Sequence, residues 1–134
     1  MNESKPTPDM SPDEFREWGY KFIDWIADYL AHPERYPVLS NVDPGWIRRQ
    51  LPANPPLKPE SVEMMMRDIE NIIVPGITHW NHPAFFAYFA VTGSGPGILG
   101  ELLSAAFNVN GMLWRTSPSA TESSCTAAGL ATAA

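Results

Sequence analysis

Apolar side chains between residues 11 and 33 recur at the three- and four-residue spacing of an amphipathic helix and form one stripe. Ser11 and Glu14 have the spacing of a capping box, and Pro12 suits the first helical position. We therefore predict a helix that begins at Ser11 and ends at Pro33, with the stripe as its packing face. The stripe consists of Phe15, Trp18, Phe22, Trp25, Ile26, Tyr29 and Leu30.

Two later segments carry the same helical periodicity. The first is predicted to run from about Glu60 to Val74, where Pro75 and Gly76 end it, and the second from about Gly97 to Phe107. No segment shows the alternation typical of a strand, so we predict a mainly α fold. The inward-facing residues are expected to be Val62, Met65, Met66, Ile69, Ile72 and Ile73 in the first helix, and Ile98, Leu99, Leu102, Leu103 and Ala106 in the second.

Proline-rich and irregular connectors separate these predicted helices. Seven prolines between residues 33 and 59 exclude a long helix or a central strand there, apart from one short turn around residues 45–48. Such a long connector is unusual inside a compact domain, so we expect the helices to lie across another subunit or domain. Residues 108–119 are expected to be irregular, with a helix start at Ser119 or Thr121.

Composition narrows the classes of partner. The 134 residues include 15 acidic and 9 basic side chains, and the net charge of −6 argues against a nucleic-acid partner. A single cysteine cannot form an internal disulfide, which favours a reducing compartment. The sequence has no signal-peptide core and no apolar run of about 18 residues. We therefore expect a cytoplasmic chain without a membrane partner.

Residues 76–89 concentrate five aromatic rings and two imidazoles. Rings at this density cannot all lie on one face of a regular element, so we expect them to line either a core or a pocket for a flat ligand. A metal site would need a third ligand beside His79 and His82, and no Asp, Glu or Cys stands nearby. We predict no metal site and interpret both histidines as hydrogen-bonded loop residues. The rings belong to Trp80, Phe85, Phe86, Tyr88 and Phe89.

The aromatic block and several flanking segments resemble the N-terminal region of the pyridoxal-phosphate-dependent group II decarboxylases, the aromatic-L-amino-acid decarboxylase family. The resemblance extends from about Ser11 to Glu122, and the order and spacing of the matching segments agree with the family throughout. These segments are Glu14–Arg16, Asp24–Tyr29, Asp43–Gly45, Leu51–Pro55, Pro75–Trp80, His82–Phe89, Leu99–Glu101 and Ser117–Glu122.

The resemblance implies the N-terminal segment of a fold-type I enzyme. In that family a homodimer binds pyridoxal 5'-phosphate through a Schiff-base lysine and removes the carboxylate of an amino acid as carbon dioxide. By resemblance, Trp80, Tyr88 and Phe89 are expected to form walls of the substrate pocket. Val91 is expected in the same substrate-binding set, and Asn110 and Met112 are expected to reach the neighbouring subunit's site.

Two departures from the family leave the substrate open. Ala90 and Val91 stand where animal members commonly have Pro-Thr, and Met112 stands where some members have Phe. A hydroxyl that could bond the substrate is therefore missing or displaced to Thr92. Tyr, Trp, Phe, DOPA and a smaller amino acid all stay open as substrates.

Beyond Glu122 the sequence departs from the family's Leu-Glu pair and amphipathic helix. Residues 123–134 are small, uncharged and aperiodic. We expect a truncated, frameshifted or natural short chain that lacks the large α/β cofactor domain. We divide it into a disordered tail at 1–10, a helical arm and aromatic pocket segment at 11–95, the start of the large-domain region at 96–122, and an aberrant tail at 123–134.

No residue of this chain is predicted to be catalytic or to bind the cofactor. Lys5, Lys21 and Lys58 are the only lysines, and none has a sequence context that matches the Schiff-base lysine. Cys125 has no recognisable partner base that would make it a nucleophile. The chain alone is therefore expected to be inactive. The alternative is a stand-alone helical module for binding or dimerisation, without catalysis.

Overall fold

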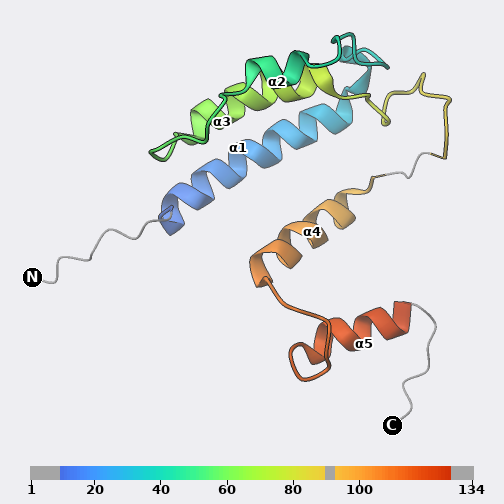
Figure 1. Ribbon diagram of the computed structural model, residues 1–134. Helices are drawn as coiled ribbons and strands as arrows, with labels where there is room; N and C mark the ends of the chain where they lie inside the picture. Colours follow the sequence, from blue (N-terminus) through green and yellow to red (C-terminus); the bar gives the residue numbers. More distant parts are fainter. Residues whose placement is uncertain (1–9, 90–92, 128–134) are drawn as a thin grey trace, which may run out of the picture. The chain divides into compact units, whose positions relative to one another are not determined.

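The computed structural model describes residues 10–89 and 93–127, and these ranges contain helices and turns but no strand. This confirms the predicted mainly α fold. The chain divides into two compact units, Met1–Ala90 and Val91–Ala134 (Figure 1). Most of the tail expected at residues 1–10, the end of the tail at residues 128–134, and Val91 lie outside the described residues.

Helix α1, Pro12–Ala31, begins where the capping box predicted. The Glu14 amide donates to Ser11 Oγ at 3.2 Å, and the Ser11 amide donates to Glu14 Oε2 at 2.9 Å. These two bonds satisfy donors that the first turn would otherwise leave unpaired. Most of the predicted stripe is half-buried, whereas Phe15 and Leu30 at its two ends are exposed.

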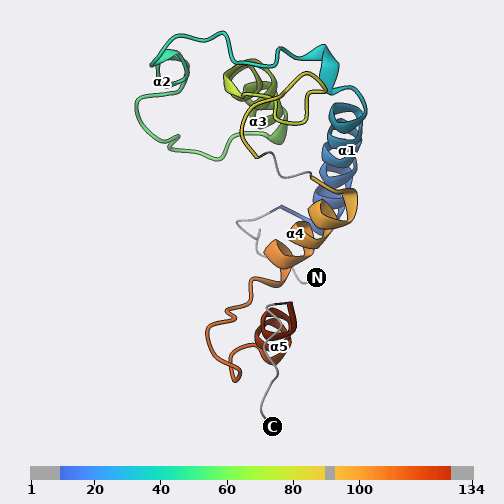
Figure 2. The ribbon, with the colours of Figure 1, turned by 90° about the vertical axis from the view of Figure 1, so that its right-hand side faces the viewer.

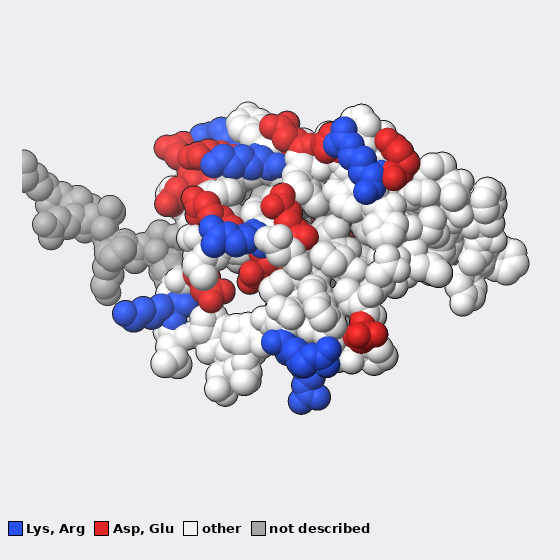
Figure 3. Space-filling view, turned by 90° about the horizontal axis from the view of Figure 1, so that it is seen from above, with Lys and Arg blue, Asp and Glu red and all other residues white. Residues whose placement is uncertain are grey.

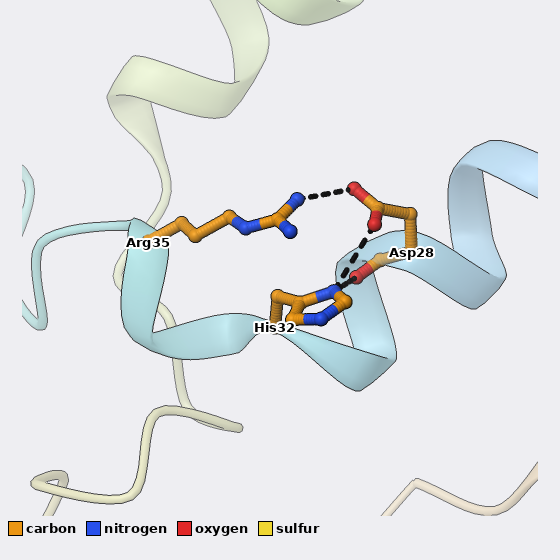
Figure 4. A network of polar contacts seen from close by, with 3 residues as sticks. All are labelled: Asp28, His32 and Arg35. Atoms are coloured by element: carbon orange, nitrogen blue, oxygen red, sulfur yellow. Dashed lines mark hydrogen bonds and ion pairs between the residues drawn. The ribbon is translucent and has the colours of Figure 1, made fainter.

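The end of α1 is closed by a small polar network. Asp28 accepts from Arg35 at 2.8 Å and lies 3.1 Å from Nδ1 of His32 (Figure 4). Pro33 does not simply end the helix, because it also starts a 3₁₀ turn, η1, at Pro33–Arg35. All three members of the network are largely exposed, so its ion pairs contribute little energy and mainly fix the direction of the connector.

The connector forms the short helix α2, Trp46–Gln50, where sequence predicted one turn. The next helical segment was predicted as one helix from Glu60 to Val74. It is instead α3, Val62–Asp68, followed by a π-helical turn η2 at Ile69–Ile73 and a 3₁₀ turn η3 at Val74–Gly76. The start is later because Ser61 caps α3 by accepting from the Met64 amide. Pro75 is accommodated because it occupies an early position of η3.

In Figures 1 and 2 the α3 segment lies between α1 and α2. This unit has a very thin core. Among the described residues Val74, 7% exposed, is the only buried hydrophobic side chain. Met65 and Ile73 were expected to face inward and are exposed within this chain. The acidic and basic side chains on the face seen in Figure 3 are intermixed beside a wide uncharged area.

In the second unit, α4 spans Gly95–Phe107 and begins two residues earlier than predicted. Ser94 explains the earlier start, because its Oγ accepts from the Gly97 amide at 3.2 Å. Most of the predicted inward residues of this helix are exposed within this chain, among them Leu99, Leu102 and Leu103, whereas Ile98 is half-buried. None of the described helices is long and apolar enough to cross a bilayer.

The irregular segment after α4 ends at Ser117, and helix α5 follows at Pro118–Ala127. Ser117 Oγ accepts from the Ala120 amide at 3.3 Å, so the helix starts before the predicted Ser119 or Thr121. The helix also continues past Glu122 into a stretch expected to be aperiodic. Alanine and serine tolerate helical backbone well enough to continue a helix that has already been nucleated.

Candidate functional site

We use the name aromatic loop for residues 77–89, which follow η3. The Trp80 ring stacks on Phe85 with centroids 5.0 Å apart and on Tyr88 with centroids 5.9 Å apart. Consecutive turns shape the backbone, since the His82 amide donates to the His79 carbonyl and the Phe85 amide donates to the His82 carbonyl. The loop therefore presents a stacked cluster of three rings.

These rings do not form a core within this chain. The exposed fraction is 47% for Trp80, 85% for Tyr88 and 98% for Phe89. Tyr88 also has a φ of 60°, a left-handed backbone that is uncommon for a bulky residue. Of the two alternatives that the sequence left open, the structure offers exposed flat surfaces rather than a core. Such surfaces suit offset or edge-on contact with another ring.

The segment that precedes these rings is tied to the N-terminal part of the same unit. His79 is only 1% exposed, and its Nδ1 lies 2.9 Å from the Tyr29 hydroxyl of α1. Its ring stacks on Tyr36 with centroids 4.7 Å apart, and its amide donates to the Val38 carbonyl at 3.0 Å. Ser40 Oγ donates to the Pro75 carbonyl at 2.9 Å. Residues 29–40 thus hold the start of the aromatic loop.

Burial is the main reason that the pKa of His79 is lowered from its usual value. A backbone hydrogen bond with Val74 raises this pKa, and the charge of His82 lowers it further. Burial also raises the pKa of Tyr29, and Tyr36 adds to this effect. At neutral pH the imidazole is therefore uncharged and the phenol keeps its proton. The Tyr29 hydroxyl and Nδ1 share a hydrogen bond in which the imidazole tautomer sets which atom donates.

His79 is the hydrogen-bonded loop histidine that the sequence predicted. His82 is also engaged, because its Nδ1 accepts from the Ala84 amide at 2.9 Å. In residues 10–89 and 93–127 no group of three or more His, Cys, Asp and Glu side chains could hold a metal ion. The sequence did not identify Tyr29 and Tyr36 as partners of His79. No local spacing links residues that are 50 positions apart, as Tyr29 and His79 are.

Asn110 and Met112 lie in the second unit, on the turn between α4 and α5. Asn110 Oδ1 accepts from the Met112 amide at 2.8 Å, and the Asn110 carbonyl accepts from Thr116 Oγ1 at 2.8 Å. Met112 is 76% exposed, so its side chain is available for contact outside this chain. The assignment of these two residues to the substrate site stays a prediction.

The described residues do not fit the lysine chemistry that pyridoxal phosphate requires. Lys21 is paired with Glu17 at 2.7 Å and lies 3.9 Å over the Trp18 ring. Lys58 is exposed in the proline-rich connector, and Lys5 lies outside the described residues. Neither described lysine is therefore a candidate for the Schiff base, and we assign no cofactor chemistry to the described residues.

Comparisons with known proteins agree with the resemblance. Over 113 residues the chain is 50% identical to tyrosine/DOPA decarboxylase 1 of Papaver somniferum, covering 84% of this chain and 22% of that protein. It is 50% identical over 119 residues to phenylacetaldehyde synthase of a Rosa hybrid cultivar, covering 89% of this chain and 23% of that protein. The crystal structure of Catharanthus roseus tryptophan decarboxylase in complex with L-tryptophan matches with a TM-score of 0.78 and 44% identity.

That structural match covers 89% of this chain and 24% of the solved chain. The chain thus spans less than a quarter of the length of these relatives, as expected for an N-terminal segment of the fold. Residues 44–127 match the pyridoxal-dependent decarboxylase conserved domain, so the similarity ends five residues later than the expected Glu122. A match over most of the chain, together with half-identical relatives, shows that this chain belongs to the pyridoxal-dependent decarboxylase family.

Proposed function

We propose that this chain is the N-terminal part of a pyridoxal-phosphate-dependent enzyme that removes the carboxylate of an aromatic L-amino acid as carbon dioxide. The observation that carries the proposal is the exposed stack of Trp80, Phe85 and Tyr88, on a loop whose start is firmly buried. Relatives named for tyrosine, DOPA and tryptophan decarboxylation support an aromatic substrate.

Within this function, Trp80, Tyr88 and Phe89 form walls for the side chain of the substrate. Each ring-to-ring contact contributes about 0.5–1.5 kcal/mol beyond the area that it buries. Val91, Asn110 and Met112 complete the substrate-binding set in the assembled enzyme. Exposed loop rings and the exposed Met112 side chain are consistent with contacts that residues outside this chain complete.

Overall identity over this segment does not separate the candidate substrates and products. The chain is 50% identical both to a tyrosine/DOPA decarboxylase and to a phenylacetaldehyde synthase. Two relatives with different names are therefore equally similar here.

The isolated chain is inactive in this proposal, because neither described lysine is a candidate for the Schiff base. The complete enzyme is a cytoplasmic homodimer. Apolar side chains on α1 and α4, among them Phe15, Leu103 and Phe107, are exposed and offer surface for a partner subunit. Exposed apolar side chains in this number on one helix often mark an interaction site.

A chimera tests the proposal. Residues 11–122 would replace the corresponding segment of the Papaver somniferum tyrosine/DOPA decarboxylase 1, and decarboxylation of tyrosine and DOPA would be measured. We expect an active dimer with normal cofactor absorbance. A chimera that folds, dimerises and binds cofactor, but decarboxylates no aromatic amino acid, would instead favour the stand-alone binding or dimerisation module.

Phe89→Ala in the chimera then tests the pocket assignment. Loss of a pocket wall should raise KM for aromatic substrates about tenfold for each 1.4 kcal/mol lost, while cofactor absorbance persists. A sharp drop in melting temperature, with an unchanged preference between aromatic and aliphatic amino acids, would show that this ring has only a structural role.

A further inference from the structure

The extent of burial changes abruptly between two neighbouring residues of the aromatic loop. His79 is 1% exposed, whereas Trp80, the next residue, is 47% exposed. Tryptophan and histidine both have intermediate tendencies to be buried, so residue type does not explain this difference. The contacts of His79 explain it.

Three separate contacts fix His79. They are the hydrogen bond to the Tyr29 hydroxyl, the stack on Tyr36 and the bond from its own amide to the Val38 carbonyl. The three partners come from α1 and from the connector that follows it, so they restrain the residue from two elements. A backbone held at one amide and one ring has little freedom to turn.

Two backbone hydrogen bonds and two ring stacks connect His79 to the exposed rings. The His79 carbonyl accepts from the His82 amide at 2.9 Å, and the His82 carbonyl accepts from the Phe85 amide at 2.9 Å. Phe85 stacks on Trp80, which in turn stacks on Tyr88. The orientation of these rings therefore depends on a residue that does not itself belong to the stack.

We propose that His79 is a positioning residue whose bond to Tyr29 sets the orientation of Trp80, and through it the surface that recognises the aromatic side chain of the substrate. The part that concerns the substrate rests on the proposed function. The part that concerns Trp80 does not, because it is a property of this chain. Loss of the bond between His79 and Tyr29 should weaken binding of the substrate ring and leave the rate of the chemical step nearly unchanged.

The orientation of Trp80 can be observed in the full 134-residue chain labelled with 5-fluorotryptophan. Trp80→Phe assigns its fluorine resonance, which should be displaced from that of free fluorotryptophan by the rings of Phe85 and Tyr88. Tyr29→Phe removes only the hydroxyl and should move this resonance toward the free position. Tyr20→Phe is the matched control, because Tyr20 is an exposed tyrosine of the same helix; it should leave Trp80 unchanged.

Two substitutions of His79 distinguish the effect of its hydrogen bond with Tyr29 from the effect of its side-chain volume. His79→Asn keeps an amide that can hydrogen-bond to the Tyr29 hydroxyl, whereas His79→Leu fills the site without a hydrogen-bonding group. The Trp80 resonance should move less in the first variant than in the second. Resonances of Trp46 and Trp114 should stay in place in both. An unmoved Trp80 resonance in Tyr29→Phe and His79→Leu overturns the proposal. A joint collapse of all tryptophan resonances in both variants also overturns it, since that marks a general structural role.

Kinetics in the chimera test the link to recognition. In Tyr29→Phe we expect KM for the aromatic substrate to rise roughly fivefold, the factor given by one hydrogen bond of ordinary strength, while kcat stays within about twofold. An unchanged KM, or a loss confined to kcat, overturns the role in recognition. A chimera without any activity contradicts the proposed function instead. The Trp80 resonance still tests independently whether the bond between His79 and Tyr29 orients Trp80.

Discussion

Gly76 lies where α2 approaches the turn after α3, and Gly76→Ala tests how closely these segments pack. A Cβ at this position would lie 2.5 Å from Ile47 Cδ1 and 3.2 Å from Ile47 Cγ1. Gly76 does not have the positive φ that favours glycine, so the expected effect is steric. The substitution should therefore destabilise the contact between α2 and η3.

The magnitude follows from the distance. Carbon atoms in contact are about 3.5–4.0 Å apart, so the Ile47 methyl group must move by roughly 1 Å or more. An off-rotamer side chain costs about 0.5–1.5 kcal/mol, and overpacking costs about 1–3 kcal/mol. Alanine offsets about 0.4–1 kcal/mol of this by restricting the unfolded chain. We expect a net local destabilisation of about 1 kcal/mol, since the half-buried Ile47 has room to adjust.

Amide hydrogen exchange measures this local stability directly. The Ile77 amide donates to the Val74 carbonyl and the His79 amide donates to the Val38 carbonyl, so both report on the region next to Gly76. Protection at these amides should fall about fivefold in Gly76→Ala, the equivalent of about 1 kcal/mol.

Ile47→Val provides the decisive background because it deletes the closest methyl group. In that background Gly76→Ala should cost distinctly less, which a double-mutant cycle detects as coupling. Gly19→Ala is the control, since a Cβ there has no atom within 4 Å; it should stabilise α1 by about 0.5–1 kcal/mol. An equal loss of protection in both backgrounds, or none in either, would refute the steric argument.

Three further predictions follow from the caps, the buried histidine and the lysines. Ser11→Ala should destabilise α1 by about 1 kcal/mol, seen as faster exchange at the first-turn amides of Glu14 and Phe15 and a loss of helical circular dichroism; unchanged exchange there would contradict the capping role. Because burial lowers the pKa of His79, the unfolded ring binds a proton first on acidification, so local stability is complete above about pH 6.5 and declines below it. Exchange at the His79 amide, corrected for its intrinsic pH dependence, should show this decline, and His79→Asn should remove it. Borohydride reduction of the chain with pyridoxal phosphate should give only trace labelling of lysines; one stoichiometric pyridoxyl-lysine would contradict the predicted inability to form the Schiff base.

The local part of the fold was predictable from sequence. The start of α1 was predictable from Ser11, Pro12 and Glu14, and its packing face was predictable from the apolar stripe. Both signals are local, because capping and helical periodicity act within a few residues. The π-helical turn η2 was not predictable, since Ile69–Ile73 continues the helical periodicity of α3. Contacts between α2 and this turn come from a distant part of the chain, and periodicity carries no information on them.

The candidate site was predictable only in part. The density of rings identified the aromatic loop, and the interpretation of His79 as a hydrogen-bonded loop histidine is confirmed. The sequence could not show that Trp80, Phe85 and Tyr88 stack together, because an irregular loop has no fixed period that brings side chains to one face. The partners of His79 were missed for the same reason, since a pairing between distant residues depends on the path of the connector.

The thin core of the first unit and its buried histidine have one physical explanation. With Val74 as the only buried hydrophobic side chain among the described residues, apolar burial within this unit cannot by itself keep the aromatic loop ordered. The contacts of Tyr29 and Tyr36 with His79 supply order at the base of the loop. The exposed rings beyond it are then free to contact atoms outside this chain. Substitutions of Tyr29 in α1, far from the loop in sequence, should therefore alter how the rings are displayed even where they leave the helix itself intact.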